Sequence, residues 1–104
     1  MKPRDTKEQR VLVVEDEAVI GRVCHKVLAD HGFAVDVVPD GQSAVDRLRK
    51  RYYYDICILD LRMPDIDGFQ LYKYIADNHR RLSRSVVFMT GDFTNSRVSR
   101  FLND

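Results

Sequence analysis

Residues 56–60 read Ile-Cys-Ile-Leu-Asp, and residues 61–68 continue Leu-Arg-Met-Pro-Asp-Ile-Asp-Gly. The apolar run predicts a buried strand, and the following Pro and Gly predict a turn. Asp60 therefore lies at the carboxyl end of a strand. Ligands of open α/β sheets bind at this end of the strands, so Asp60 is placed where a functional carboxylate is expected.

Two further apolar runs end in polar residues. Residues 11–14, Val-Leu-Val-Val, precede Glu15 and Asp16, and residues 86–89, Val-Val-Phe-Met, precede Thr90 and Gly91. Because the carboxyl ends of parallel strands meet at one edge of a sheet, these runs bring three acids and a hydroxyl together. This is the layout of a metal-assisted phosphoryl site.

The hydrophobic pattern alternates between strands and helices. Strands are expected at 10–15, 33–38, 54–59 and 85–89, and helices at 17–31, 41–51, 68–78 and from 94 or 95 to about 102. Gly32 should end the first helix, while Asp40 and Asp67 should cap the second and third. Such alternation with short loops predicts a parallel sheet with helices on both faces, an α/β fold.

The pattern also predicts which side chains of several segments are buried and which are exposed. The first helix should bury one stripe, and its members are Ile20, Val23, Cys24, Val27 and Leu28. Tyrosines 52–54 should pack at the start of the third strand, and the run 80–84, Arg-Arg-Leu-Ser-Arg, should be a solvated basic loop.

Composition limits the possible classes. With 104 residues the chain forms one domain, and 44% apolar residues suffice for a core. A net charge of +1 predicts no strong field for nucleic acid, and no apolar run approaches the roughly 20 residues that span a membrane. Cys24 and Cys57 are expected to be buried thiols in a reducing compartment. Residues 1–9 are polar and are expected to be a linker or a frayed leader.

The acids are costly unless a cation joins them. Two like charges 4 Å apart repel by about 4 kcal/mol at an effective dielectric near 20. Alone, Asp16 could cap a helix and Asp60 a turn, but together with Glu15 they indicate a site for Mg²⁺ or Mn²⁺, which favour oxygen ligands. Asp60 is also a candidate nucleophile, because carboxylates form aspartyl phosphates. The hydroxyl of Thr90 could donate a hydrogen bond to a phosphoryl oxygen.

Segments 11–17, 58–68 and 87–91 together resemble the receiver domain of two-component response regulators, over residues 10 to 104. The resemblance implies a flavodoxin-like, doubly wound parallel sheet and a cytoplasmic protein. It implies that Asp60 accepts phosphate from a histidine kinase or phosphotransfer domain, and that Thr90 is the switch hydroxyl. It implies metal ligation by Asp16, by Glu15 through water, by Asp60 and by the backbone carbonyl of Arg62. The partner would dock on the exposed side of the first helix, near Val19 and Gly21.

This sequence departs from the family pattern at its C-terminal end. Receivers continue into a fifth strand bearing a Lys about twenty residues after Thr90, whereas no Lys here follows Lys73. The expectation is therefore a receiver incomplete at residue 104, with strand order 2-1-3-4. The edge of strand 85–89 would then be open to dimerisation or swapping. Residues 86–92 and 100–103 resemble receivers attached to hybrid sensor histidine kinases, and a stand-alone or DNA-binding response regulator stays open as the alternative.

Three other functions stay open on the sequence alone. A phosphatase of the haloacid-dehalogenase kind needs a second Asp two residues after the nucleophile, where this chain has Arg62, a poor proton donor. A pseudo-receiver that acts as an interaction module without phosphorylation is compatible with the absent Lys. A nucleotide- or flavin-binding protein would need a phosphate loop after the first strand, where Glu15 and Asp16 would repel phosphate.

Overall fold

The computed structural model describes residues 8–50, 53–62 and 68–89. Four parallel strands form one sheet in the order β2-β1-β3-β4, namely β1 (Arg10–Val14), β2 (Ala34–Val38), β3 (Ile56–Asp60) and β4 (Val86–Met89). The helices are α1 (Ala18–Asp30), α2 (Gly41–Arg49), α3 (Gly68–Asn78) and the single turn α4 (Arg80–Ser83). The predicted class and the strand order are confirmed. Predicted boundaries differ by one or two residues, and the predicted helix near 94–102 lies outside the described residues.

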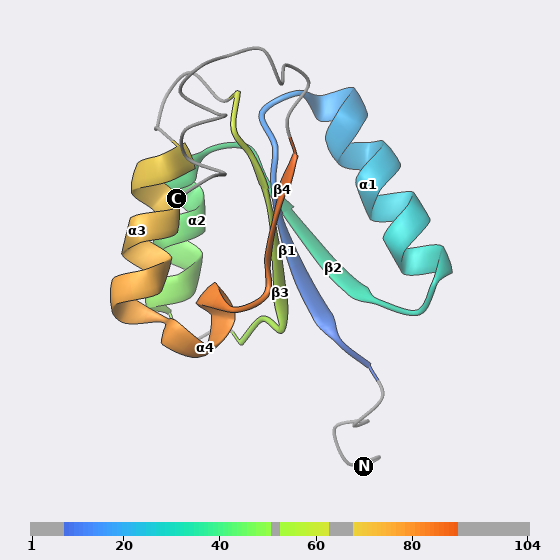
Figure 1. Ribbon diagram of the computed structural model, residues 1–104. Helices are drawn as coiled ribbons and strands as arrows, with labels where there is room; N and C mark the ends of the chain where they lie inside the picture. Colours follow the sequence, from blue (N-terminus) through green and yellow to red (C-terminus); the bar gives the residue numbers. More distant parts are fainter. Residues whose placement is uncertain (1–7, 51–52, 63–67, 90–104) are drawn as a thin grey trace.

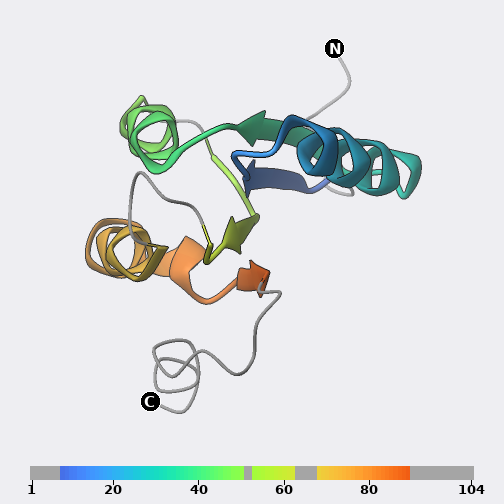
Figure 2. The ribbon, with the colours of Figure 1, turned by 90° about the horizontal axis from the view of Figure 1, so that it is seen from above.

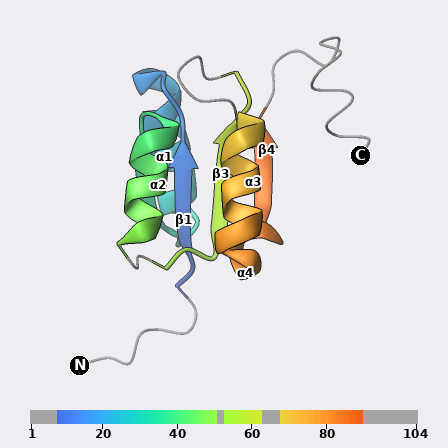
Figure 3. The ribbon, with the colours of Figure 1, turned by 90° about the vertical axis from the view of Figure 1, so that its left-hand side faces the viewer.

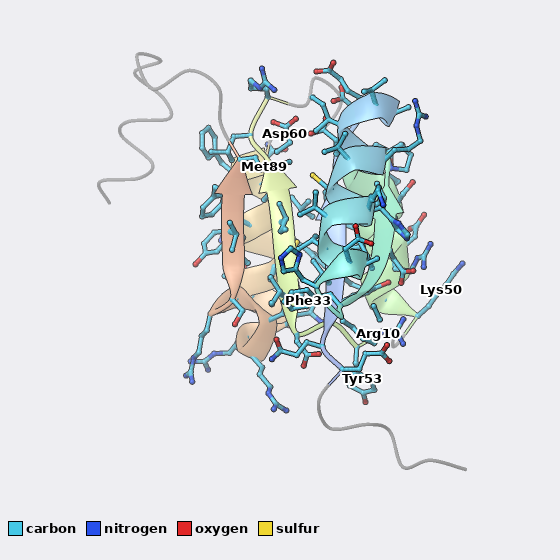
Figure 4. The ribbon with its side chains drawn as sticks, turned by 90° about the vertical axis from the view of Figure 1, so that its right-hand side faces the viewer. Arg10, Phe33, Lys50, Tyr53, Asp60 and Met89 are labelled. Atoms are coloured by element: carbon cyan, nitrogen blue, oxygen red, sulfur yellow. The ribbon has the colours of Figure 1, made fainter. Side chains whose placement is uncertain are left out.

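The helices cover the two faces of the sheet unequally (Figures 1 and 2). Helices α2, α3 and α4 lie on one face, and α1 lies on the other. Seen from the side of α2 and α3, these two helices stand in front of the strands (Figure 3). Figure 4 shows the opposite side, where α1 lies in front of β1 and β2 and leaves β3 and β4 in view.

The larger core lies between the sheet and helices α2 to α4. Alternate strand residues point into it, as the pleat requires; those of β1 and β3 are fully buried, and those of β4 are partly buried. Its buried members are Leu12, Val14, Val38, Ala44, Leu48, Tyr54, Cys57, Leu59, Leu71, Ile75 and Leu82. This packing holds β1 and β3 side by side, so their carboxyl ends are fixed relative to each other.

The ends of the helices follow the predicted signals where they are described. Asp40 precedes α2 and accepts a hydrogen bond from the backbone N–H of Ser43 at 2.7 Å, as an N-cap does. Gly32 has a φ of +93°, the left-handed conformation that ends α1. Asp67, the predicted cap of α3, lies outside the described part of the chain.

The predicted inward stripe of α1 is wrong at two positions. Val23 and Val27 are 56% and 50% exposed, and with Val19 at 63% they form an outward row at i, i+4 and i+8. The sheet instead contacts the row that contains Ile20, Cys24 and Leu28, which are half-buried. Gly21 is buried rather than near the exposed face, since a Cβ there would meet Val37 Cγ1 at 3.0 Å. A small residue therefore lets α1 approach β2.

Three smaller predictions are also corrected. The basic run at 80–84 is not a loop, because α4 is closed by the bond from Ser83 N–H to the His79 carbonyl and anchored by Leu82, which is 6% exposed. Tyr53 does not pack, with 81% of its surface exposed, whereas Tyr54 does; Tyr52 lies outside the described residues. Cys57 is buried as predicted, but Cys24 is only half-buried.

Tyr54 joins the two halves of the sheet at the end opposite the acids. Its hydroxyl donates to Asp36 Oδ2 at 2.6 Å, and the same oxygen pairs with Arg10 at 3.3 Å and Arg47 at 3.4 Å. The Arg10 guanidinium also lies 5.5 Å from the centre of the Tyr54 ring. Burial, and then the Asp36 carboxylate, raises the pKa of Tyr54 to about 12, so the phenol stays protonated as the donor.

We expect Tyr54→Phe to lower the free energy of unfolding by about 1 to 2 kcal/mol, because a hydrogen bond to a charged, partly exposed acceptor is lost. Urea denaturation at neutral pH measures this change. Tyr53→Phe is the matched control, since Tyr53 is exposed and its change should be within about 0.5 kcal/mol. Equal losses in both variants would contradict the role of the bond.

Candidate functional site

The carboxyl ends of β1 and β3 place three acids in one cluster. The ligand oxygens of Glu15, Asp16 and Asp60 all lie within 4.8 Å of one another. Glu15 and Asp60 are each 2% exposed, whereas Asp16 is exposed. Asp60 stands at the top of β3 beside Met89 of β4 (Figure 4). The predicted gathering of Glu15, Asp16 and Asp60 at one edge is therefore observed.

Backbone hydrogen bonds hold the two buried acids in position. The N–H of Glu15 donates to the Val38 carbonyl at 3.0 Å, which continues the pairing of β1 with β2 by one residue. The N–H of Leu61 donates to the Met89 carbonyl at 3.0 Å, which fixes the residue after Asp60. The acids are thus attached to the rigid sheet rather than to free loops.

The two oxygens of Glu15 have different surroundings. Oε2 accepts the backbone N–H of Glu17 at 3.0 Å, while Oε1 is buried and has no hydrogen-bond partner among the described residues. A buried oxygen without a partner is costly, and each such atom in a folded protein requires an explanation. A cation bound between the acids provides one.

Burial is the largest cause that raises the pKa of Glu15, to about 7. The neighbouring Asp60 carboxylate adds to the rise, and the hydrogen bond from Glu17 opposes it. Near neutral pH the cluster therefore resists carrying its full negative charge. At 4.8 Å, each like-charged pair repels by roughly 3 kcal/mol at an effective dielectric near 20.

Arg62 supplies a positive charge beside Asp60. Its backbone N–H donates to Asp60 Oδ1 at 2.8 Å, and its side-chain Nε lies 3.6 Å from the same oxygen. The Arg62 side chain is 51% exposed, so it extends from the buried acid to solvent. The family resemblance implied a metal-ligand role for the Arg62 carbonyl; the ion pair of its side chain was not foreseen.

Gly68 was predicted to shape the loop after Asp60, and the structure adds a reason. A Cβ at Gly68 would lie 2.9 Å from Leu61 Cδ2, and 3.5 Å from the Asp60 carbonyl oxygen. The first residue of α3 therefore packs directly against the segment that follows Asp60. Thr90, Pro64 and the rest of the loop at 63–67 lie outside the described residues.

The donor set fits a hard divalent cation. Within the described residues the cluster offers only carboxylate oxygens, and one of these is buried without a partner there. This set suits Mg²⁺ or Mn²⁺ better than metals that prefer sulfur or imidazole. A dehalogenase-type phosphatase uses an Asp two residues after its nucleophile as the general acid, and this chain has Arg62 at that position.

Comparison with known proteins identifies the class. Residues 11–104 match the family model of the response regulator receiver domain, and the chain belongs to this family. It is 37% identical over 94 residues to Transcription factor SKN7 of Saccharomyces cerevisiae, covering 88% of this chain and 14% of that protein. It is 31% identical to Histidine kinase 2 of Arabidopsis thaliana over 78% of this chain and 7% of that protein. The matched region is therefore a small part of each of these relatives.

Solved structures agree with this fold. The Vibrio cholerae chemotaxis protein CheY4 superposes with a TM-score of 0.81 at 23% identity, over 92% of this chain and 79% of that chain. A sensor protein from Polaromonas sp. JS666 superposes with a TM-score of 0.73 at 28% identity, over 95% and 73%. The chain is a receiver domain of two-component phosphorelay signalling, and the phosphatase and flavin-binding alternatives are set aside.

Among the described residues, no helix combines the length and the apolar character that crossing a bilayer requires.

Proposed function

We propose that this domain accepts a phosphoryl group on Asp60 from a phosphohistidine of a histidine kinase or phosphotransfer domain. One observation carries the proposal, namely that two neighbouring parallel strands bring three carboxylates within 4.8 Å around a buried oxygen that has no partner in the described part of the chain. Such an arrangement is unfavourable in itself and becomes useful when a cation and a phosphoryl group enter it.

The transfer is a substitution at phosphorus. An Asp60 carboxylate oxygen forms the new bond, and the phosphorus–nitrogen bond of the donor breaks, with its electron pair leaving on the nitrogen. Asp60 is held for this role by its place at the end of β3 and by the N–H of Arg62, which fixes Oδ1. The hydrogen bond from Arg62 is made to Oδ1, and Oδ2 is the oxygen proposed to attack phosphorus.

The proposed metal ligands are Glu15, Asp16, Asp60 and the backbone carbonyl of Arg62, with Glu15 acting through water. When bound, Mg²⁺ or Mn²⁺ would neutralise charge on the phosphoryl oxygens. Thr90 is proposed to donate its hydroxyl to the phosphoryl group and so to couple phosphorylation to a conformational switch. A charge-assisted hydrogen bond of this kind contributes about 1.5 to 3 kcal/mol, enough to bias a two-state segment.

Phosphorylation by a small donor tests the proposal. The chain is incubated with phosphoramidate and either Mg²⁺ or a chelator, and its intact mass is read. We expect a gain of one phosphoryl group that requires the cation. A folded chain that binds Mg²⁺ but gains no mass would contradict the proposal and favour the pseudo-receiver alternative, an interaction module that works without phosphorylation.

The outward valine row of α1 is proposed as the docking surface for the phosphohistidine donor. Val19 lies in the first turn of α1, three residues after Asp16, so this surface begins next to the acids. Val19, Val23 and Val27, with Arg22 and Lys26 beside them, line a shallow groove. An exposed apolar row of this kind favours contact with a partner.

We expect Val19→Ser to slow transfer from a phosphorylated phosphotransfer domain about tenfold, because an apolar contact at an interface is lost. The rate with phosphoramidate should stay unchanged, because this small donor needs no docking. Val87→Ser is the matched control, a valine on β4 that is 51% exposed, compared with 63% for Val19. Equal slowing with both donors would show damage to the site instead of lost docking.

The proposal extends to the domain's context. Residues 10–104 form the receiver, residues 1–9 are a linker or a frayed leader, and the parent is a hybrid histidine kinase or a response regulator in the cytoplasm, where Cys24 and Cys57 stay reduced. The domain itself binds neither nucleic acid nor membrane. Within the described residues β4 has a neighbouring strand on one side only, which supports a dimer or swap through this edge. A molar mass that stays monomeric at high concentration would exclude that association.

A further inference from the structure

We propose that the Arg62 side chain is a built-in counter-charge of Asp60, which opposes cation binding and favours phosphoryl transfer. This inference rests on the proposed function. Its observation is the double contact of Arg62 with one oxygen, in which the backbone N–H lies 2.8 Å and the side-chain Nε 3.6 Å from Asp60 Oδ1. Arg62 is thus the basic residue that pairs with the acidic cluster in the described part of the chain.

The position of the guanidinium explains how the charge acts. The Asp60 side chain is 2% exposed, so bulk solvent screens its charge only weakly. The Arg62 side chain is 51% exposed and reaches Asp60 from the solvent side. A positive charge so close to the cluster lowers its affinity for a divalent cation, both by repulsion and by occupying Oδ1. The same charge stabilises a phosphoryl group, which is dianionic and forms on the adjacent atom.

Neutralising Arg62 should therefore change two quantities in opposite directions. The affinity for Mg²⁺ should rise, and the rate of phosphorylation at saturating Mg²⁺ should fall. A residue that only maintains the shape of the loop would weaken both together. Substitution isolates the side chain, because the backbone N–H and carbonyl of residue 62 remain in place.

The experiment compares the full chain with Arg62→Gln, which is neutral, and Arg62→Lys, which keeps the charge. Lys73→Gln is the matched control, since Lys73 is 78% exposed on α3 and pairs with Asp77 away from the site. The first readout is calorimetric titration of the unphosphorylated chain with Mg²⁺ alone. The second is the rate of mass gain from phosphoramidate at saturating Mg²⁺.

We expect Arg62→Gln to bind Mg²⁺ about three- to tenfold more tightly and to gain phosphate about five- to tenfold more slowly. Lys73→Gln should stay within about twofold of the unaltered chain in both readouts. Arg62→Lys keeps the charge but not the guanidinium, so it should show both changes to a smaller extent than Arg62→Gln. Unchanged values in Arg62→Gln, or a parallel loss of both, would overturn the inference.

Failure of the proposed function gives a different result. An unaltered chain that never gains a phosphoryl group contradicts that function, and the Mg²⁺ titration then decides the inference alone. Tighter binding in Arg62→Gln would support the counter-charge, and unchanged or weaker binding would overturn it.

Discussion

Asp60→Asn is expected to abolish phosphorylation, with at least a hundredfold loss of the rate of mass gain. An amide oxygen is a poor nucleophile, and one of the three charges that would hold the cation is lost. The substitution is nearly isosteric, and the amide oxygen can still accept the N–H of Arg62 that now bonds Oδ1 at 2.8 Å. The loss should therefore come from chemistry and not from misfolding.

The stability of the same variant separates these two causes. In the absence of metal, Asp60→Asn should be at least as stable as the unaltered chain, because it removes a buried charge from between like charges. Asp77→Asn is the matched control, an exposed acid on α3 whose replacement should leave phosphorylation unchanged. Urea denaturation and intact mass, measured on all three proteins, check both expectations.

If Asp60→Asn is still phosphorylated, another residue of the cluster must be the phosphoacceptor. Peptide mapping of the phosphorylated chain, after reduction of the acyl phosphate, would then identify it. Loss of both phosphorylation and folding in Asp60→Asn would leave the nucleophile unproven by this variant, and Asp60→Glu, which keeps the charge but shifts its position, would decide the matter.

Glu15→Gln is expected to change how the stability of the metal-free chain depends on pH. The folded-state pKa of Glu15 is raised by burial to about 7, above its ordinary value of 4.5. Below pH 4.5 both folded and unfolded chains carry the proton, so the shift has no effect. Between about pH 4.5 and 7 the unfolded chain loses the proton first, so stability falls as the pH rises.

The size of this effect follows from the shift. This rise in the pKa of Glu15 on folding lowers the free energy of unfolding by about 3 kcal/mol once the pH exceeds 7. Gln cannot ionise, so Glu15→Gln should gain about 3 kcal/mol relative to the unaltered chain between pH 4 and pH 8. Urea denaturation at several pH values, with a chelator present, measures this difference.

The neighbouring Glu17 provides the control for Glu15. It is exposed and its side chain makes no cap hydrogen bond, so Glu17→Gln should show the pH dependence of the unaltered chain. Saturating Mg²⁺ should remove most of the difference at pH 8, because a bound cation stabilises the ionised cluster. Parallel stability curves for Glu15→Gln and Glu17→Gln would refute the raised pKa.

The sequence determined the outline of the fold through local and repeated signals. Apolar runs such as 11–14 and 56–59 predicted buried parallel strands, because a strand covered on both faces has no polar side. Asp40 caps the start of α2 and Gly32 follows the end of α1, both as predicted, because capping depends on residues close in the chain. The same logic placed Glu15, Asp16 and Asp60 together, since parallel strands share the edge at which they end.

The helix α1 shows where this logic stops. Its sequence carries two adjacent apolar rows, one through Ile20, Cys24 and Leu28 and one through Val19, Val23 and Val27. Periodicity alone cannot choose between rows that differ by one position. The contact of Gly21 with Val37 turns the first row toward the sheet and leaves the second exposed.

The sequence alone thus determined the class of fold, the edge that carries the site and the identity of its acids. Only the tertiary structure decided how each acid is held, with one Glu15 oxygen buried without a partner among the residues that the structure describes, and with Asp60 paired with the side chain of Arg62. The physical reason is one of range. Strand and cap signals act over a few residues, whereas burial and the electric field at Glu15 and Asp60 depend on groups brought together from distant parts of the chain.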